Sequence, residues 1–252
     1  MTSVRDLVHA IATTAPPRPR LTWYGPDAER VELSGRVLLN TVVKATNLLV
    51  DVADLGPRST ILLDLPLHWR TIVWTLAGWT AGAEVVVPRG SSAGRSGGDA
   101  RTGADVVVSD RPARADTNAV TGPAVVIGVA LPALAMRFPG ALPPGAIDGA
   151  ADLMTYPDAL GWVPAIEPDA PALSGVAREP VDHRDLMPWS LATAAADAWP
   201  DRPRVLAAGP DVATGLAAAL AAWARDGSLV LTADPLTEPG KLATQERVTA
   251  VL

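Results

Sequence analysis

Residues 21–87 read LTWYGPDAERVELSGRVLLNTVVKATNLLVDVADLGPRSTILLDLPLHWRTIVWTLAGWTAGAEVVV, and this stretch decides the fold that we expect. Thr60–Leu65 and Glu84–Val87 are short apolar runs of the kind found in buried parallel strands. Trp69–Ala81 lies between them and predicts a helix. Strand, helix and strand within about thirty residues form a βαβ unit, which crosses over right-handed.

The first half of the same stretch predicts a lead-in to that unit. Leu21–Tyr24 and Arg30–Leu33, separated by a Gly-Pro-Asp turn, predict a β-hairpin. Apolar residues then recur at helical spacing from Val37 to Leu49, and Ser34 is placed to cap that helix.

The rest of the chain continues the alternation of strands and helices. We expect the helix at 182–198 to be kinked or restarted by Pro188, and residues 131–180 to be mostly loops. The fold class predicted is α/β, with a doubly wound, mainly parallel sheet. We expect a single α/β domain over residues 1–252, with weak internal divisions near the 88–103 loop and the loop-rich 131–180 segment. The further predicted elements are helices at Arg5–Thr14, Asp182–Ala198 and Val212–Arg225, and strands at Ala104–Ser109, Ala124–Val129, Val205–Ala208 and Ser228–Thr232.

Composition excludes several classes of function. Hydrophobic residues make up 48% of the chain and charged residues 19%, as in folded globular proteins. A formal net charge of −6 argues against nucleic-acid binding, which needs a basic face. There is no cysteine, and the apolar run Val212–Ala224 is shorter than the ~20 residues of a membrane span. The N-terminal residues do not form a secretory signal, so we expect a cytoplasmic protein without membrane contact.

The stretch 21–87 resembles the first third of the AMP-forming acyl-CoA synthetase and adenylation-domain superfamily. The hairpin and helix, and then the strand, Pro turn, helix and AGA-apolar strand, follow in that family's order. The segment DHRDL at Asp182–Leu186 is similar to the THxxL segment that follows the family's phosphate loop. The resemblance implies the fold of the N-terminal subdomain of adenylate-forming enzymes. The chain also resembles a small, truncated actinobacterial family of unknown function.

The resemblance fails at the phosphate loop. Where the family carries a Ser/Thr/Gly-rich loop with a lysine, this chain has PALSGVAREP at 171–180. Backbone N–H groups of a Gly-rich turn bind phosphates, and a lysine adds positive charge. Ser174 and Gly175 match the remnant of that loop, whereas Glu179 would repel phosphate. The family's later motifs lie beyond Leu252. We therefore expect no adenylate formation by this chain alone and no cofactor, with ATP or AMP binding left open.

His183 is the histidine of most interest. In the resemblance it follows the phosphate loop, so together with Ser174 and Gly175 it marks a vestigial ligand cleft. The alternative is a structural residue at a helix start, partly exposed and preceded by a capping Asp182. His68, just after Pro66, is expected at the N-terminal end of a helix. The histidines are scattered, so we expect no metal site.

A second chemistry is suggested by Gly90-Ser91-Ser92-Ala93-Gly94, which fits the nucleophile-elbow pattern G-x-S-x-G. Asp110 or Asp152 and then His183 would complete a Ser, Asp, His order. No good helix start follows the motif, so the alternative is a flexible surface loop. Trp162 is one of eight tryptophans, which are either packed in a core or exposed as a binding patch.

These observations lead to three hypotheses. The first is a degenerate, non-catalytic homologue that acts by binding a ligand or a protein, as a homo-oligomer or with a partner protein. The second is a nucleotide- or acyl-adenylate-binding subunit that a partner completes. The third is a serine hydrolase that uses Ser92.

Overall fold

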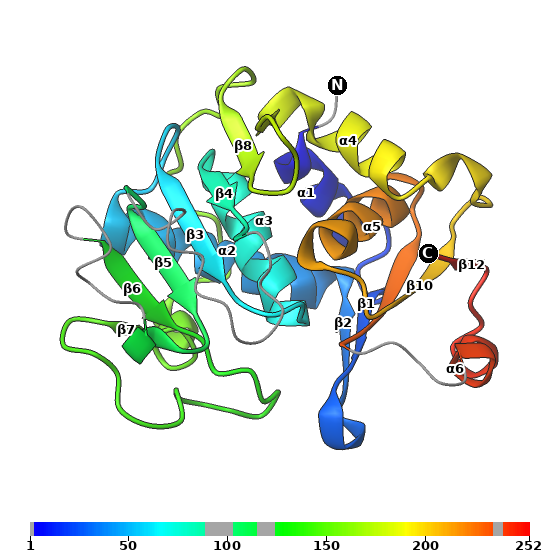
Figure 1. Cartoon of the computed structure of the whole chain (residues 1–252), viewed down its shortest axis with the longest axis horizontal. Helices are drawn as coiled ribbons and strands as arrows, with labels where there is room; N and C mark the ends of the chain where they lie inside the picture. Colours follow the sequence, from blue (N-terminus) through cyan, green and yellow to red (C-terminus); the bar gives the residue numbers. More distant parts are fainter. Residues whose placement is uncertain (1–2, 89–102, 115–123, 234–238) are drawn as a thin grey trace. The chain divides into compact units, whose positions relative to one another are not determined.

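The computed structural model describes residues 3–88, 103–114, 124–233 and 239–252 (Figure 1). The chain folds into two compact units. Unit 1 takes the described residues within 1–39, 67–72 and 184–252, and unit 2 takes those within 40–66 and 73–183. Each unit contains one sheet, and each is described by itself.

Unit 1 is built on a five-stranded sheet with the strand order β12-β10-β11-β1-β2. The predicted hairpin is present, since β1 and β2 pair in antiparallel fashion, whereas the other neighbouring strands pair in parallel. The strands are β1 (Pro19–Tyr24), β2 (Arg30–Ser34), β10 (Arg204–Ala208), β11 (Ser228–Thr232) and β12 (Ala250–Val251).

The helices of unit 1 follow from their sequences. In α1 (Val4–Thr14) one apolar face is buried, and Ser3 and Asp6 form a capping box at its start. In α5 (Val212–Ala224) ten of thirteen residues are buried, as expected for a helix that is apolar all round. Asp211 caps α5 by accepting a hydrogen bond from the N–H of Thr214 at 2.9 Å. The short α6 (Pro239–Gln245) precedes β12.

The helical region predicted over 182–198, kinked or restarted by Pro188, is present as separate pieces and not as one continuous helix. The structure has strand β9 (Val181–Asp182), a 3₁₀ turn, helix α4 (Leu186–Thr193) and a second 3₁₀ turn. Pro188 lies in the first turn of α4, where backbone N–H groups have no partner within the helix. A proline there starts a helix without kinking it, and the preceding residues are free to form a strand.

Unit 2 is built on a seven-stranded sheet with the order β7-β6-β5-β3-β4-β8-β9. All neighbouring pairs are parallel except β8 and β9. The strands not yet given are β3 (Thr60–Asp64), β4 (Glu84–Val86), β5 (Val106–Ser109), β6 (Val125–Gly128), β7 (Ile147–Asp148) and β8 (Pro171–Ser174).

The predicted βαβ unit is confirmed as β3, α3 (Trp69–Ala81) and β4. Gly78 explains how closely the second half of α3 packs on this sheet. A Cβ at Gly78 would lie 2.7 Å from Cδ1 of Ile61 and 3.0 Å from Cγ2 of Val85. The long helix α2 (Gly35–Ala53) also matches its prediction, and Ser34 accepts a hydrogen bond from the N–H of Val37 at 3.3 Å.

The predicted α/β class, with mainly parallel sheets and flanking helices, is confirmed. The sequence pattern did not separate the strands into two sheets, and it missed β7, β8 and β9 between residues 131 and 182. That the chain behaves as a single domain stays a prediction. Among the described helices, none is both long and apolar enough to cross a membrane. The 3₁₀ turns cover Pro26–Ala28, Pro112–Arg114, Asp152–Thr155, His183–Asp185 and Ala196–Ala198.

Candidate functional site

The hairpin of β8 and β9 carries Ser174 and Gly175, which the sequence resemblance matches to the family's phosphate loop. Strand β8 pairs in parallel with β4, which puts Leu173 beside Val85, and in antiparallel fashion with β9. The indole N–H of Trp79 donates to the carbonyl of Ala172 at 2.7 Å and holds the middle of β8. The connection 175–180 therefore leaves a buried, well-supported strand.

Ser174, at the end of β8, directs its hydroxyl toward a carboxylate. Its Oγ donates a hydrogen bond to Oε1 of Glu84, the first residue of β4. In the part of the chain that the structure describes, Glu84 makes no ion pair with an arginine or lysine. The hydroxyl that the resemblance assigns to phosphate binding is thus bonded to a negative charge.

Gly175 follows with a backbone conformation that glycine adopts readily. Its φ is +83°, and a Cβ at this position would lie 1.9 Å from the carbonyl oxygen of Val87. The N–H of Val87 in turn donates to the carbonyl of Ser174 at 3.0 Å. The close approach of two backbones explains this glycine without a ligand.

The rest of the connection is polar and exposed. Arg178 and Glu179 are both exposed, so the loop carries one charge of each sign. A single cation beside a carboxylate differs from the lysine-containing loop of the resemblance. Ser174 and Gly175 are neighbours, as their sequence requires, but the loop that they begin presents no concentration of positive charge.

His183 lies at the other end of β8. Its backbone N–H donates to the carbonyl of Ala170 at 3.1 Å, four residues before Ser174. Four residues of strand span about 13 Å, so the structure does not bring His183 to Ser174 and Gly175. The expectation that His183 is partly exposed is wrong, since only 8% of it is exposed. Inside the protein its ring has a polar partner, because Nε2 lies 3.0 Å from the carbonyl oxygen of Gly82.

His68 is at the N-terminal end of α3, as predicted, and it is buried. Its Nδ1 accepts a hydrogen bond from the N–H of Arg70 at 3.1 Å, and its ring packs edge-on against Trp23. Burial, and then the charge of Arg70, lower the pKa of His68 from 6.5 to about 3. The imidazole is therefore neutral at physiological pH, which suits a helix cap.

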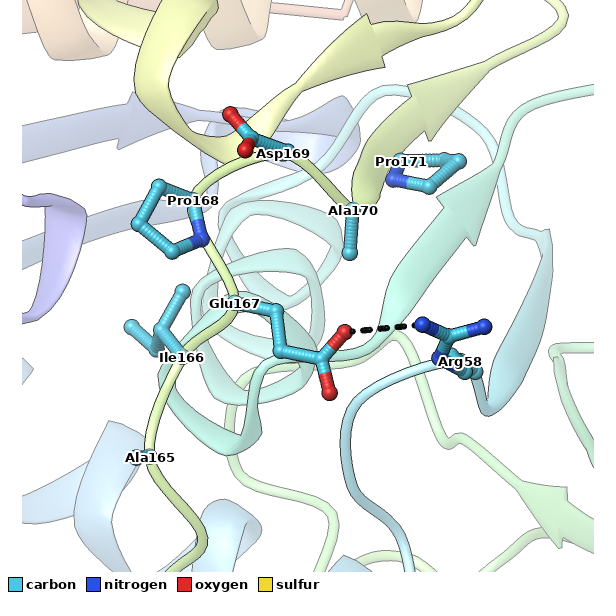
Figure 2. Close-up of a pocket in the computed structure, with 8 residues that line it drawn as sticks. All are labelled: Arg58, Ala165, Ile166, Glu167, Pro168, Asp169, Ala170 and Pro171. Carbon is cyan, nitrogen blue, oxygen red and sulfur yellow. Dashed lines mark hydrogen bonds and ion pairs between the residues drawn. The ribbon is translucent and has the colours of Figure 1, made fainter.

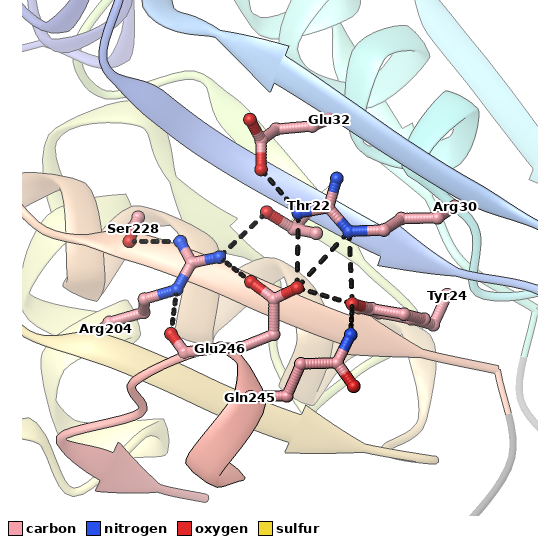
Figure 3. Close-up of polar contacts among 8 residues, drawn as sticks. All are labelled: Thr22, Tyr24, Arg30, Glu32, Arg204, Ser228, Gln245 and Glu246. Carbon is pink, nitrogen blue, oxygen red and sulfur yellow. Dashed lines mark hydrogen bonds and ion pairs between the residues drawn. The ribbon is translucent and has the colours of Figure 1, made fainter. Parts of the chain in front are cut away.

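A polar centre in unit 1 was missed by sequence reasoning (Figure 3). The carboxylate of Glu246, only 6% exposed, pairs with Arg204 and with Arg30, and it accepts a hydrogen bond from the hydroxyl of Tyr24. Arg204 also donates to Thr22 at 3.2 Å and to Ser228 at 3.1 Å. The one available signal in the sequence was Arg204 at the start of the buried strand β10, because a charged side chain there needs a partner.

This Glu246 centre is built as an anchor for the C-terminal segment. Burial alone would raise the pKa of Glu246, but hydrogen bonds from Tyr24 and Arg204 and the charge of Arg204 outweigh it, and the pKa is lowered. Arg204 Nε also donates to the backbone carbonyl of Glu246 at 2.6 Å. An ionised carboxylate whose oxygens face two guanidinium groups stabilises structure and has no proton to exchange near neutral pH.

The other predicted chemistry is that of a serine hydrolase. Gly90, Ser92 and Gly94 lie outside the described residues, so the hydrolase hypothesis stays a prediction. Asp152 accepts a hydrogen bond from the N–H of Asp148 at 3.0 Å, and burial raises the pKa of Asp110. Among residues 3–88, 103–114, 124–233 and 239–252, no group of three or more His, Asp or Glu side chains is placed to hold a metal ion.

Comparisons with known structures identify the fold. The chain is similar to an acyl-CoA synthetase of Brucella canis, with a TM-score of 0.74 and 20% identity over 99% of this chain and 46% of that one. It is similar to the amide bond synthetase McbA of Marinactinospora thermotolerans, with a TM-score of 0.68 and 19% identity over 99% of this chain and 48% of that one. The chain thus spans about half the length of these two enzymes.

An isolated N-terminal domain is also similar. The inhibitor-bound N-terminal domain of FACL13 from Mycobacterium tuberculosis matches with a TM-score of 0.69 and 14% identity over 98% of this chain and 62% of that one. The fold is therefore that of the N-terminal part of acyl-CoA synthetases, as the sequence predicted.

No model of a protein family matches the chain. A curated protein does: the "TIGR03089 family protein" of Mycobacterium tuberculosis (strain ATCC 25618 / H37Rv) is 36% identical over 248 residues, which cover 94% of this chain and 92% of that protein. This agrees with the actinobacterial family expected from the sequence. The chain belongs to the TIGR03089 family.

Proposed function

We propose that this protein is a non-catalytic member of the acyl-CoA synthetase fold that acts by binding, in the cytoplasm, and does not form acyl-adenylates by itself. The observation that carries the proposal is the contact between Ser174 and Glu84 at the base of the β8–β9 loop. This contact supports the proposal that the loop is now a structural element and no longer binds phosphate.

The charges around this loop oppose phosphate binding. A triphosphate needs several N–H donors and positive charge around it. Here the hydroxyl of Ser174 donates to Glu84, and Glu179 adds an exposed carboxylate to the same loop. Gly175, which would allow a phosphate to approach the backbone, instead lies against the carbonyl of Val87. Each of these features disfavours the binding of an anion at this loop.

The test is thermal unfolding of the purified full chain with Mg-ATP, AMP or a non-hydrolysable acyl-adenylate analogue. A ligand at 100 times its Kd adds about 2.7 kcal/mol, which raises Tm by roughly 5–10 °C in a chain of this size. We expect no shift with any of the three and no exchange of pyrophosphate into ATP, with a full-length acyl-CoA synthetase as the positive control.

A Tm rise of several degrees with a nucleotide, without exchange activity, would favour the subunit hypothesis, in which a partner completes the site. Exchange activity by the chain alone would overturn the proposal. Labelling by a fluorophosphonate that Ser92→Ala abolishes would favour the hydrolase hypothesis. Light scattering on the same sample measures whether the protein is a homo-oligomer.

A further inference from the structure

A segment of unit 2 forms an acidic strap on the surface. The strap, residues 151–171, leads from the 3₁₀ turn after β7 into β8. It contains four acidic residues and no lysine, arginine or histidine. Its formal charge is therefore −4, which is a large part of the net charge of −6 of the whole chain. The acidic residues are Asp152, Asp158, Glu167 and Asp169.

One face of α2 holds the first half of the strap. Asn40, Lys44, Asn47 and Asp51 are spaced by four, three and four residues, so they share one face of the helix. The side chain of Asn47 donates to the carbonyl of Ala159 at 3.0 Å and accepts from the N–H of Gly161 at 2.9 Å.

Two other residues of this polar face, Lys44 and Asp51, make further bonds to the strap. Lys44 pairs with Asp158 at 2.8 Å and also donates to the carbonyl of Tyr156. The hydroxyl of Tyr156 donates to Asp51 at 2.8 Å. Burial, and then the bond to Asp51 and the charges of Asp51 and Asp152, raise the pKa of Tyr156 to about 12. The strap is thus fixed in place, in a negative electrostatic environment.

The fixed strap exposes large apolar side chains. Met154 is 61% exposed, Leu160 38% and Trp162 77%. Such residues are normally buried, and tryptophan is the side chain most enriched among those that dominate the energy of protein interfaces. Because Asn47 holds the backbone at Gly161, a partner that packs on Trp162 does not have to order the backbone next to it.

A pocket of about 660 Å³ lies along the second half of the strap (Figure 2). It is lined by Arg58 and by the second half of the strap, residues 165–171, which include Ile166, Pro168 and Pro171. Trp162 is three residues from Ala165, so their Cα atoms are at most about 11 Å apart. The volume is that of a site for a few side chains or a small ligand.

Charge around the pocket selects the occupant. Glu167 and Asp169 line it, against one cation, Arg58. Arg58 pairs with Glu167 at 3.3 Å, but the two side chains are 82% and 50% exposed, and such a pair contributes little. An incoming cation can therefore replace Arg58 at Glu167 at small cost, while a carboxylate would meet the strap's acidic residues.

We propose that the strap and its pocket bind a basic, apolar peptide segment of a partner protein. One apolar side chain of that segment enters the pocket, another packs on Trp162, and its lysines or arginines pair with Glu167 and Asp169. The inference goes beyond the proposed function, since it concerns a different surface and holds whether or not the chain binds a nucleotide.

The test is fluorescence polarisation with three synthetic, labelled 12-residue peptides. The first has alternating lysine and leucine, the second has glutamate for lysine, and the third has serine for leucine. We expect the first peptide to bind at least tenfold more tightly than the other two, and to weaken as salt is raised. Trp162→Ser, and the double variant Glu167→Lys with Asp169→Lys, should each weaken binding at least tenfold.

Matched controls are Leu134→Ser, which removes an exposed leucine elsewhere in unit 2, and Asp201→Lys, which reverses an exposed charge in unit 1. Both should leave binding within twofold. A photoreactive form of the first peptide should cross-link to Arg58 or to residues 151–171. The inference is wrong if the first peptide does not bind, if the controls weaken binding as much as the strap variants, or if the cross-links lie elsewhere. Because no nucleotide is present, this result is independent of the thermal unfolding test.

Discussion

His68 and His183 are both buried, yet their hydrogen bonds have opposite directions. In unit 1, Nδ1 of His68 accepts from the backbone N–H of Arg70. In unit 2, Nε2 of His183 lies against the carbonyl of Gly82, and a carbonyl can only accept, so this nitrogen must carry the proton. Protonating the ring therefore breaks the bond of His68 and keeps that of His183. The acid sensitivity of His68 therefore has three sources, which are its burial, the charge of Arg70 and the N–H group that its ring nitrogen accepts from.

The largest effect we expect is an acid-dependent loss of stability caused by His68. Its pKa is about 3 in the folded protein and 6.5 in the unfolded chain, so the unfolded state binds one more proton between these values. The stabilisation is complete above pH 6.5 and is lost as pH falls. At 1.36 kcal/mol per pH unit, the loss is on the order of 2 kcal/mol between pH 6.5 and 5.

Urea unfolding at several pH values measures this loss. His68→Gln keeps an oxygen that accepts from Arg70 but does not titrate, so its stability should fall less between pH 6.5 and 5. His9→Gln, at an exposed position of α1, is the control and should follow the wild type. If the stability of His68→Gln and that of the wild type depended equally on pH, His68 would not be the cause of the acid sensitivity.

The second effect is a loss of stability on protonation of Glu246, and it occurs at a lower pH than that of His68. Because its pKa is lowered from 4.5, its stabilisation is present above about pH 4.5 and is lost as pH falls through the folded-state pKa. At pH 7, Glu246→Gln should lower the free energy of unfolding by about 1.5 kcal/mol, since it removes charged hydrogen bonds to Arg204 and Arg30.

Glu32→Gln is the matched control in unit 1. Glu32 pairs with Arg30 at 2.7 Å, but the two side chains are 36% and 41% exposed. An exposed pair contributes little, so this variant should stay within about 0.5 kcal/mol of the wild type. Similar losses for the two variants would mean that Glu246 is no anchor.

The smallest effect is expected at His183. His183→Phe leaves the buried carbonyl of Gly82 without its donor and should lower the free energy of unfolding by about 1 kcal/mol at pH 7. His183→Gln supplies an N–H group and should recover most of that loss. A Gln variant as unstable as the Phe variant would show that ring packing, and not the donated proton, makes this histidine important.

Most of the elements were predictable where the signal is local. Trp69–Ala81 matches its predicted helix because Pro66 and Gly82 bound an apolar run. The β8–β9 hairpin was missed because its strands have four and two residues, and their stability depends on pairing with β4. The helical region predicted at 182–198 was confirmed only in part, because the pattern could not tell a proline that kinks a helix from one in the first turn of a new helix.

The candidate site was only partly predictable. Ser174 and Gly175 came from a resemblance, but their surroundings depend on residues distant in the sequence. Glu84 is 90 residues from Ser174, and Gly82 is 101 residues from His183. The Glu246 centre is harder still to predict from the sequence, since Tyr24 and Glu246 are 222 residues apart.

Local sequence patterns alone predicted the α/β class, the βαβ unit and most helices and strands, and the resemblance predicted the loss of the family's phosphate-loop residues. These follow from hydrophobic periodicity, turn residues and residue identity, which act over a few positions. Only the tertiary structure decided the division into two sheets, the bond between Ser174 and Glu84, the opposite roles of the two histidines and the exposure of Trp162. The reason is that a hydrogen bond or a buried surface needs a partner, and here the chain supplies that partner from a distant position.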